Sequence, residues 1–399
     1  MMSNISQAYI WKVLSVLLIF LAIKLNFLFL PFETFTHLTV SFALASPVSM
    51  ILLWGADITG QRQMSSHQTD DASQLLVSFL FGSLPAIIAA TLFTKAQLQM
   101  ILLVLSIALF RAICRYLTML NIQYQVESKR AQTALTITEP LLWGATSIIF
   151  IGAELAGYNE VSLAMLGGKI ALATFVSLGA IIVFLPYRPS LTFSQIGAQI
   201  TRHNFFAKGK LSLAGALNST FVSLPVVMLT NINLTNEAAL FAVAQRYANM
   251  ILLFEQVRSR MFSAKFITVA SDNIAEKKAL FRSHRRNALL TGIATSAALS
   301  GGIGLLAFFA LVPELHYPSL VCAMIIAILV LFEFGSGSIL LLQKREKDYI
   351  LANLISCSLI VFASSFVTTL AMSFAMFIVA RVIYVMLLYR SLTVLIPNQ

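Results

Sequence analysis

Long apolar runs separated by short polar breaks extend through the whole chain. A helix needs about 20 mainly apolar residues to cross a hydrocarbon core of about 30 Å, and the runs have this length. The pattern predicts an all-α integral membrane protein with about twelve transmembrane helices. We expect them at roughly 9–30, 35–56, 74–93, 97–120, 133–153, 162–185, 209–230, 237–257, 287–311, 319–341, 349–370 and 372–391.

The last two predicted helices come from one apolar run of about 40 residues, which is too long for a single crossing. We divide this run near Thr368 and Ser373. A polar stretch in mid-chain separates two six-helix halves, so we expect an N-terminal lobe at 1–190 and a C-terminal lobe at 209–399. The stretch between them, 191–208, mixes apolar and polar residues and is either an interfacial helix or a plain cytoplasmic linker.

Basic residues gather in alternate breaks. The breaks after predicted helices 2, 4, 6, 8 and 10 are all basic, whereas the others contain one lysine and no arginine. The positive-inside rule places the basic breaks and both termini in the cytoplasm. The same rule accounts for the formal net charge of +11, so nucleic acid is not an expected partner. The N-terminal apolar run is too long for a signal-peptide core and is expected to be a retained first helix.

Composition and motifs argue against an enzyme. The 399 residues are 58% hydrophobic and 11% charged, with a mean hydropathy of +0.86. No phosphate-binding G-x-x-x-x-G-K-S/T loop, zinc-binding H-E-x-x-H, C-x-x-C or G-x-S-x-G pattern occurs. The three cysteines, Cys114, Cys322 and Cys357, lie in apolar runs without metal-ligand spacing. We therefore expect no enzymatic activity, no cofactor and no metal.

Several basic residues fall deep inside predicted helices, where a charge is costly and marks a functional candidate. Arg246, Arg381 and Arg111 lie roughly ten residues from the nearer helix end, too far to reach the interface easily. Lys24 lies in the outer third of the first helix, and Arg62 follows the inner end of the second. Arg246 flanks a polar stripe that contains Gln245 and Asn249.

Acidic residues at membrane depth are fewer. The candidates are Glu139, directly before Pro140; Glu333, just ahead of "GSGS"; and Asp57. Each either neutralises a neighbouring arginine or titrates during a transport cycle. A bundle with mainly basic deep charges attracts anions, and arginine suits phosphates because its planar fork binds two oxygens. An amphiphile with a phosphate or pyrophosphate head is therefore the expected cargo.

Two segments carry a family resemblance. "KGKLSLAGALNSTFVSLPVVML" followed by "LTNEAALFAVAQRYANMILLFEQVRSRMFSAKFITVAS" resembles helices 7 and 8 of the Wzx-type O-antigen and polysaccharide flippases of the multidrug/oligosaccharidyl-lipid/polysaccharide (MOP) exporter superfamily. Phe241, Ala242, Ala244 and Arg246 match its aromatic-Ala-x-Ala-x-Arg pattern. "GSGSILLLQKREKDYILANLIS" resembles the junction of helices 10 and 11, whereas "LPFETFTHL" and "LTNINLT" depart from the family pattern.

The resemblance implies two six-helix lobes around a central cavity that opens alternately to each side. It implies an undecaprenyl-diphosphate-linked oligosaccharide as cargo, moved from the inner to the outer leaflet of a bacterial inner membrane for O-antigen or lipopolysaccharide synthesis. It also implies ion coupling, and a polysaccharide polymerase and chain-length regulator as partners. Two alternatives stay open: a drug or metabolite antiporter of the same superfamily, and an O-antigen polymerase or ligase, which the short outer loops disfavour.

Overall fold

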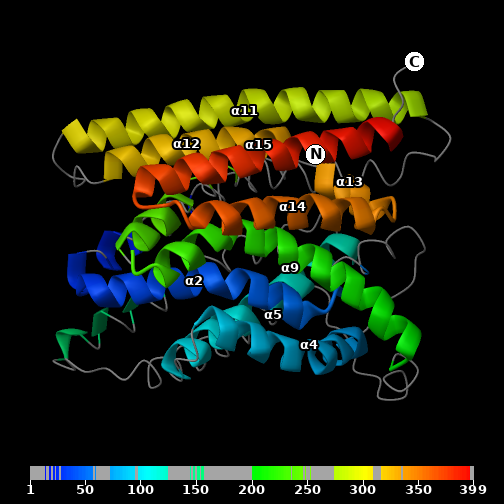
Figure 1. Ribbon diagram of the computed structural model, residues 1–399, viewed down its shortest axis with the longest axis horizontal. Helices are drawn as coiled ribbons and strands as arrows, with labels where there is room; N and C mark the ends of the chain where they lie inside the picture. Colours follow the sequence, from blue (N-terminus) through cyan, green and yellow to red (C-terminus); the bar gives the residue numbers. More distant parts are fainter. Residues whose placement is uncertain are drawn as a thin grey trace. The chain divides into compact units, whose positions relative to one another are not determined.

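The regular elements of the described chain are α-helices, as predicted (Figure 1). This computed structural model describes residues 14, 18, 21–22, 24–26, 28–56, 59, 72–94, 98–124, 144, 147–148, 151–152, 154–156, 200–234, 236–245, 248, 252, 274–308, 316–333 and 336–395. The labelled helices are α2 (Phe32–Leu53), α4 (Ala72–Phe93), α5 (Leu98–Tyr124), α9 (Arg202–Asn231), α11 (Ile274–Phe308), α12 (His316–Glu333), α13 (Ser336–Leu342), α14 (Glu346–Ser364) and α15 (Leu370–Leu395).

Five stretches of the described helices are long and apolar enough to cross a membrane. Their length and composition agree with the prediction of a protein that crosses the bilayer several times. The five are Thr34–Leu53, Leu75–Phe93, Phe205–Asn231, Glu346–Ser364 and Leu370–Leu392.

The chain divides into two compact units, Met1–Ser223 (unit 1) and Leu224–Gln399 (unit 2). The division falls within α9, which begins at Arg202 and so includes the end of the predicted linker. The lobe limits at 190 and 209 stay a prediction.

Helix boundaries confirm one prediction and correct two others. The long C-terminal apolar run is broken between Ser364 and Leu370, which includes Thr368, one of the two residues near which we divided it, whereas Ser373 lies inside α15. α11 begins at Ile274 rather than near residue 287, so the expected loop before it is wrong over 274–286. The sequence "SDNIAE" carries a helix start that hydropathy alone missed, since Asp and Asn favour N-caps and Glu276 suits the first turn. The helix expected at 319–341 is described as two, α12 and α13.

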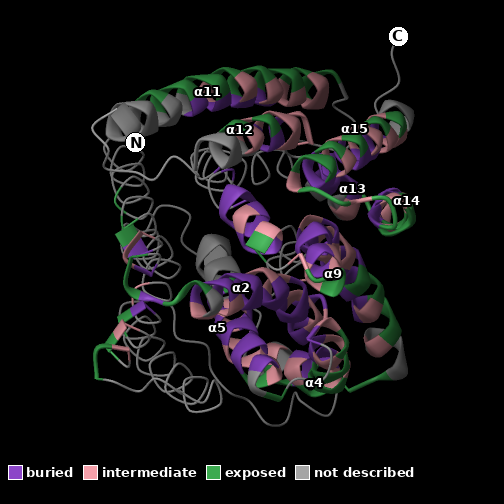
Figure 2. Ribbon diagram, turned by 60° about the vertical axis from the view of Figure 1, so that its left-hand side comes forward, coloured by how far each residue is buried: buried purple, intermediate pink, exposed green. Residues whose placement is uncertain are grey.

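In unit 1, α2 packs against both α4 and α5. α4 keeps an apolar stripe exposed while its opposite face, which includes Ala86 and Ala90, is buried (Figure 2). Gly82 allows the close approach to α2, because a Cβ there would lie 2.4 Å from the Ile51 carbonyl oxygen. The exposed stripe repeats every turn, as expected for a lipid-facing surface: Leu76, Leu80, Leu84, Ile88 and Leu92.

The end of α2 is tied to the start of α9. α2 stops in a left-handed turn at Trp54 (φ 43°) and Gly55 (φ 77°). A Cβ at Gly55 would lie 2.6 Å from the Lys208 carbonyl oxygen, so both conformation and space require glycine. The Trp54 ring lies 5.2 Å from that of Phe205, and its Nε1–H donates to the Phe205 carbonyl oxygen at 3.3 Å.

In unit 2, α12 packs against α11 and α15, and α15 also contacts α13 and α14. α11 turns small or polar residues, His284, Ala288 and Ser296, to the buried side. Gly292 continues this face against Leu331 of α12. Helices without bulky side chains at the contact approach closely, as is common in membranes.

We expect Gly82→Ala to destabilise the protein by about 1–3 kcal/mol, because the new methyl group would overlap fixed backbone atoms of α2. The measurement is thermal unfolding in detergent micelles. Gly301→Ala is the matched control, since nothing lies within 4 Å of a Cβ at that exposed helical position. Equal stability of the two variants would contradict the packing described here.

Candidate functional site

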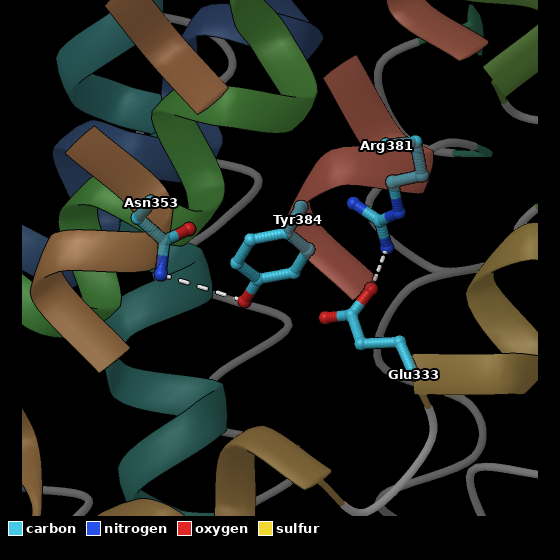
Figure 3. A network of polar contacts seen from close by, with 4 residues as sticks. All are labelled: Glu333, Asn353, Arg381 and Tyr384. Carbon is cyan, nitrogen blue, oxygen red and sulfur yellow. Dashed lines mark hydrogen bonds and ion pairs between the residues drawn. The ribbon is translucent and has the colours of Figure 1, made fainter. Parts of the chain in front are cut away.

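A buried ion pair joins α12 to α15. Glu333 lies at the last position of α12, and Arg381 lies near the middle of α15. The Arg381 Nη2 donates to Glu333 Oε2 in an ion pair (Figure 3), and the two side chains are only 3% and 13% exposed. A buried charge needs such a partner, because neither lipid nor apolar side chains can solvate it.

Polar side chains of α14 and α15 surround this pair. The Arg381 guanidinium carbon lies 5.5 Å from the ring centre of Tyr384. The Tyr384 hydroxyl accepts a hydrogen bond from Asn353 Nδ2 at 3.4 Å (Figure 3). Asn353 and Tyr384 are fully buried. The network therefore links three helices through four side chains in the interior of unit 2.

Gly337 of α13 packs closely against Tyr349 of α14, beside the network. A Cβ at Gly337 would lie 2.5 Å from Cε2 of Tyr349, whose carbonyl oxygen accepts a hydrogen bond from Asn353 Nδ2 at 2.9 Å. Ser336, the neighbouring residue, is fully buried. Within the described residues, Ser336 Oγ and Asn353 Oδ1 have no hydrogen-bond partner. The Ser336 hydroxyl can therefore donate to or accept from a water molecule or a polar ligand, and the Asn353 amide oxygen can accept from one.

The segment with the aromatic-Ala-x-Ala pattern packs inside unit 2. Residues 236–245 are helical, and Phe241, Ala242, Ala244 and Gln245 are all buried. The Phe241 ring stacks on Phe374 at 4.6 Å and meets Phe377 edge-on at 5.6 Å. The aromatic position of the motif is thus a packing anchor against α15. The small alanines fit the same close contact.

Arg111 lies in unit 1 and binds a backbone oxygen of α2. Its Nη1 donates to the Phe42 carbonyl oxygen at 2.7 Å, and the guanidinium carbon lies 5.5 Å from the Phe42 ring centre. The next carbonyl, that of Ala43, would accept from the N–H of residue 47 in a regular helix, but residue 47 is proline. Ser223 of α9 donates to the Ala43 oxygen instead, at 2.9 Å. Two neighbouring carbonyls near the proline are therefore satisfied by other helices.

Lys24 is half-buried and lies close in sequence to a second polar contact. Asn26 is fully buried and donates through Nδ2 to Ser147 Oγ at 2.9 Å. This bond joins the first helical segment to a residue far along the chain.

The structure brings together two of the predicted site residues, Arg381 and Glu333. Arg111, Lys24 and Gln245 have the separate environments given above, so the structure does not gather the described candidates into one cluster. Five others lie outside the described residues: Arg246, Arg62, Asn249, Glu139 and Asp57. Among the residues that are described, no group of three or more His, Cys, Asp or Glu side chains is arranged to hold a metal ion.

Sequence reasoning missed the uncharged members of the unit 2 network, Asn353, Tyr349 and Tyr384. We searched helix interiors for charges, and a single Asn or Tyr in an apolar run is not unusual. A combined search would have helped, because Tyr349 and Asn353 are four residues apart and share a helix face, while Arg381 and Tyr384 are three apart on the other helix.

Comparison with solved structures shows that the chain has a known fold. The MATE multidrug transporter DinF-BH, solved in complex with a small-molecule ligand, superposes with a TM-score of 0.66 at 14% identity, covering 98% of this chain and 95% of that one. The fold is that of the MOP superfamily. Comparison with protein-family models and with curated protein sequences finds no match.

Other proteins with the MOP fold superpose over the same length. A MOP superfamily transporter from Pyrococcus furiosus, whose binding pocket is described as having reversed polarity that suggests a different function, gives a TM-score of 0.60 at 13% identity over 99% and 95% of the two chains. An outward-facing MATE transporter gives 0.56 at 12% identity over 99% and 92%. The predicted MOP-like architecture is thereby confirmed over nearly the whole chain.

Replacing one partner of the Glu333–Arg381 pair should destabilise the protein strongly. We expect Glu333→Gln and Arg381→Met each to lower the free energy of unfolding by about 3 kcal/mol, because each leaves the other group buried without its ionic partner. The double variant should lose less than the sum of the two. Reversible unfolding in mixed micelles measures all three values, and strictly additive losses would mean that the two side chains do not depend on each other.

Restoring a backbone donor at position 47 should make the Ser223 hydroxyl less important. Ser223→Ala should cost about 1 kcal/mol in the native chain and less in a Pro47→Ala background, where the new N–H can bond to the Ala43 oxygen. Thr230→Ala is the control, because its hydroxyl donates to Val226 within its own helix. A Ser223→Ala cost that is equal in both backgrounds would contradict this assignment.

Proposed function

We propose that this protein is a flippase that moves an undecaprenyl-diphosphate-linked oligosaccharide from the inner to the outer leaflet of a bacterial inner membrane by alternating access. The observation that carries the proposal is a MOP fold with Arg381 buried inside a membrane-spanning helix. The resemblance of the Phe241 segment to Wzx-type flippases supports the choice of cargo. The repeat unit of O-antigen or a related polysaccharide is the expected glycan.

The charge at depth favours an anionic cargo. Arg381, Arg111 and Lys24 lie within described helices, and Glu333 is the acid that accompanies the first of them. A pyrophosphate carries several oxygens that suit the planar donors of arginine. The P. furiosus transporter with reversed pocket polarity provides a precedent, in its description, for the MOP fold serving a different function.

The ion pair offers a mechanism for coupling. In the cargo-free state Glu333 neutralises Arg381. A pyrophosphate oxygen that binds Arg381 takes the place of the Glu333 carboxylate, which then gains a proton on its oxygen and becomes neutral. Release of the cargo at the other side returns that proton to water and restores the pair. Asn353 and Tyr384 keep the Arg381 side chain in position during the exchange.

The other predicted residues complete this proposal. Arg246, with Gln245 and Asn249 beside it, is proposed as a second cargo contact. Arg111, which donates to the Phe42 carbonyl oxygen, is proposed as a further cargo contact. The remaining proposed cation contacts and coupling acids are Lys24, Arg62, Glu139 and Asp57.

The proposed setting follows from the cargo. A flippase of this kind delivers lipid-linked units to a polysaccharide polymerase, and a chain-length regulator acts with that polymerase. Both termini are proposed to face the cytoplasm because the basic breaks predict it. No cofactor takes part in the proposed cycle.

A second candidate is a drug or metabolite antiporter of the same superfamily. It is favoured by the multidrug MATE transporters among the structures with this fold. It is disfavoured by the basic character of the deep charges, since a cationic drug needs unpaired carboxylates. The polymerase or ligase alternative receives no support from a fold shared with transporters.

The test is a leaflet assay in proteoliposomes. Purified protein is reconstituted with a short undecaprenyl-diphosphate-linked glycan, and a membrane-impermeant lectin measures the outer fraction over time. Arg381→Ala and Arg246→Ala should slow translocation by about ten-fold or more, because each removes a charged contact. Arg115→Ala, an exposed arginine of α5, is the control that should keep the native rate. Glu333→Gln should still translocate but lose its response to a pH gradient.

Three results would count against the proposal. Full translocation by stable Arg246→Ala and Arg381→Ala proteins would remove these residues from the site. Transport of a cationic dye without any movement of the glycan would favour the antiporter. A persistent pH response in Glu333→Gln would place the coupling group elsewhere.

A further inference from the structure

Three helices of unit 2 share a surface pattern in which an exposed cation lies four residues from a large exposed apolar side chain. Four residues span about 6 Å along a helix and return to the same face. The surface therefore changes from charged to apolar within one turn on each helix. The pairs are Arg286 and Leu290 on α11, Lys347 and Leu351 on α14, and Arg390 and Met386 on α15, with the apolar members 62%, 57% and 65% exposed.

Two contacts place the cations at the same end of unit 2. The Arg285 guanidinium carbon of α11 lies 4.4 Å from the ring centre of Tyr389 in α15. Arg345, just before α14, donates through Nη1 to the Ser391 carbonyl oxygen of α15 at 3.1 Å. The part of α11 around Arg285, the start of α14 and the last turns of α15 are therefore neighbours.

The charge of this end is strongly positive. Among the described residues its acidic members are Glu276, Glu346 and Asp348, and Asp348 is paired with Arg345. We call the basic set the basic rim, and within the described residues it comprises Lys277, Lys278, Arg282, Arg285, Arg286, Lys344, Arg345, Lys347 and Arg390.

The length of α11 explains why its cations lie beyond the apolar layer. Its 35 residues span about 52 Å, whereas a hydrocarbon core is about 30 Å thick. Arg282 and Arg286 are exposed on one face, and Leu290 and Ile293 continue that face toward the apolar part. A helix that passes from the headgroup layer into the acyl layer has this order of side chains.

We propose that the basic rim binds the headgroups of acidic phospholipids. Its cations contact the phosphates while the apolar side chains one turn away contact the acyl chains of the same lipids. A soluble polyanion would use the charges but leave the adjoining apolar surface unexplained. The positive-inside pattern predicts that this end faces the cytoplasm, where the anionic leaflet attracts basic segments. The site is separate from the Arg381 network and does not depend on the cargo.

The experiment measures lipid retention by the full-length protein. Native mass spectrometry from detergent micelles compares phosphatidylglycerol with phosphatidylcholine of the same acyl chains. The native protein should retain phosphatidylglycerol preferentially, and added salt should reduce the preference. Arg286→Gln combined with Arg390→Gln should weaken phosphatidylglycerol binding by about ten-fold or more, since each cation near a lipid surface contributes several-fold.

Two controls separate a local site from net charge and from misfolding. Arg115→Gln combined with Lys210→Gln removes the same charge from exposed positions of unit 1 and should leave the lipid preference unchanged. Arg286→Lys keeps the charge and should bind as the native protein does. An unchanged melting temperature in each variant shows that the fold is intact.

Several outcomes would overturn the proposal. Equal loss in the unit 1 control would mean that net charge alone sets the preference. Equal retention of the two lipids by the native protein would mean that there is no headgroup site. Displacement of the lipid by inorganic pyrophosphate at micromolar concentration would identify a soluble polyanion site instead.

Discussion

Lipid offers no hydrogen bonds, so a polar group within the spanning helices of this protein is costly unless the protein itself supplies its partner. The structure meets this constraint mainly with local bonds: Thr36, Thr39 and Ser41 each donate to the carbonyl one turn before them in α2. Where local bonds fail, other helices supply the donor. This requirement accounts for the bond from Ser223 of α9 to the Ala43 carbonyl near Pro47 and for the pairing of Arg381 with Glu333.

The same constraint gives the half-buried Arg111 and the buried Arg381 different environments. Arg111 binds a backbone carbonyl of the helix that contains Pro47. Arg381 binds a carboxylate, which can be neutralised or replaced. A side chain with an exchangeable partner suits a transport cycle better than one bound to a fixed backbone oxygen. Of the two proposed cargo contacts, Arg381 is therefore the stronger candidate.

The MOP fold is reached here at 14% identity to the DinF-BH transporter. Such divergence is possible because hydrophobic length and small residues at helix contacts can be kept while most side chains change. Gly82 and Gly292 are positions of this kind, since each lies where two helices nearly touch. A few polar side chains can change the cargo without changing these helix contacts. Similarity of fold alone therefore does not identify the substrate.

Hydrophobic length by itself determined the all-α membrane class, the approximate positions of the helices and the division between α14 and α15, because the bilayer sets how long a spanning run must be. It did not locate the start of α11, where a polar helix continues beyond the membrane and carries no hydropathy signal. Charge at depth pointed to Arg381 and Glu333 separately. Only the tertiary structure paired them and added Tyr384 and Asn353, since such contacts join residues on different helices, which their spacing in the sequence does not encode.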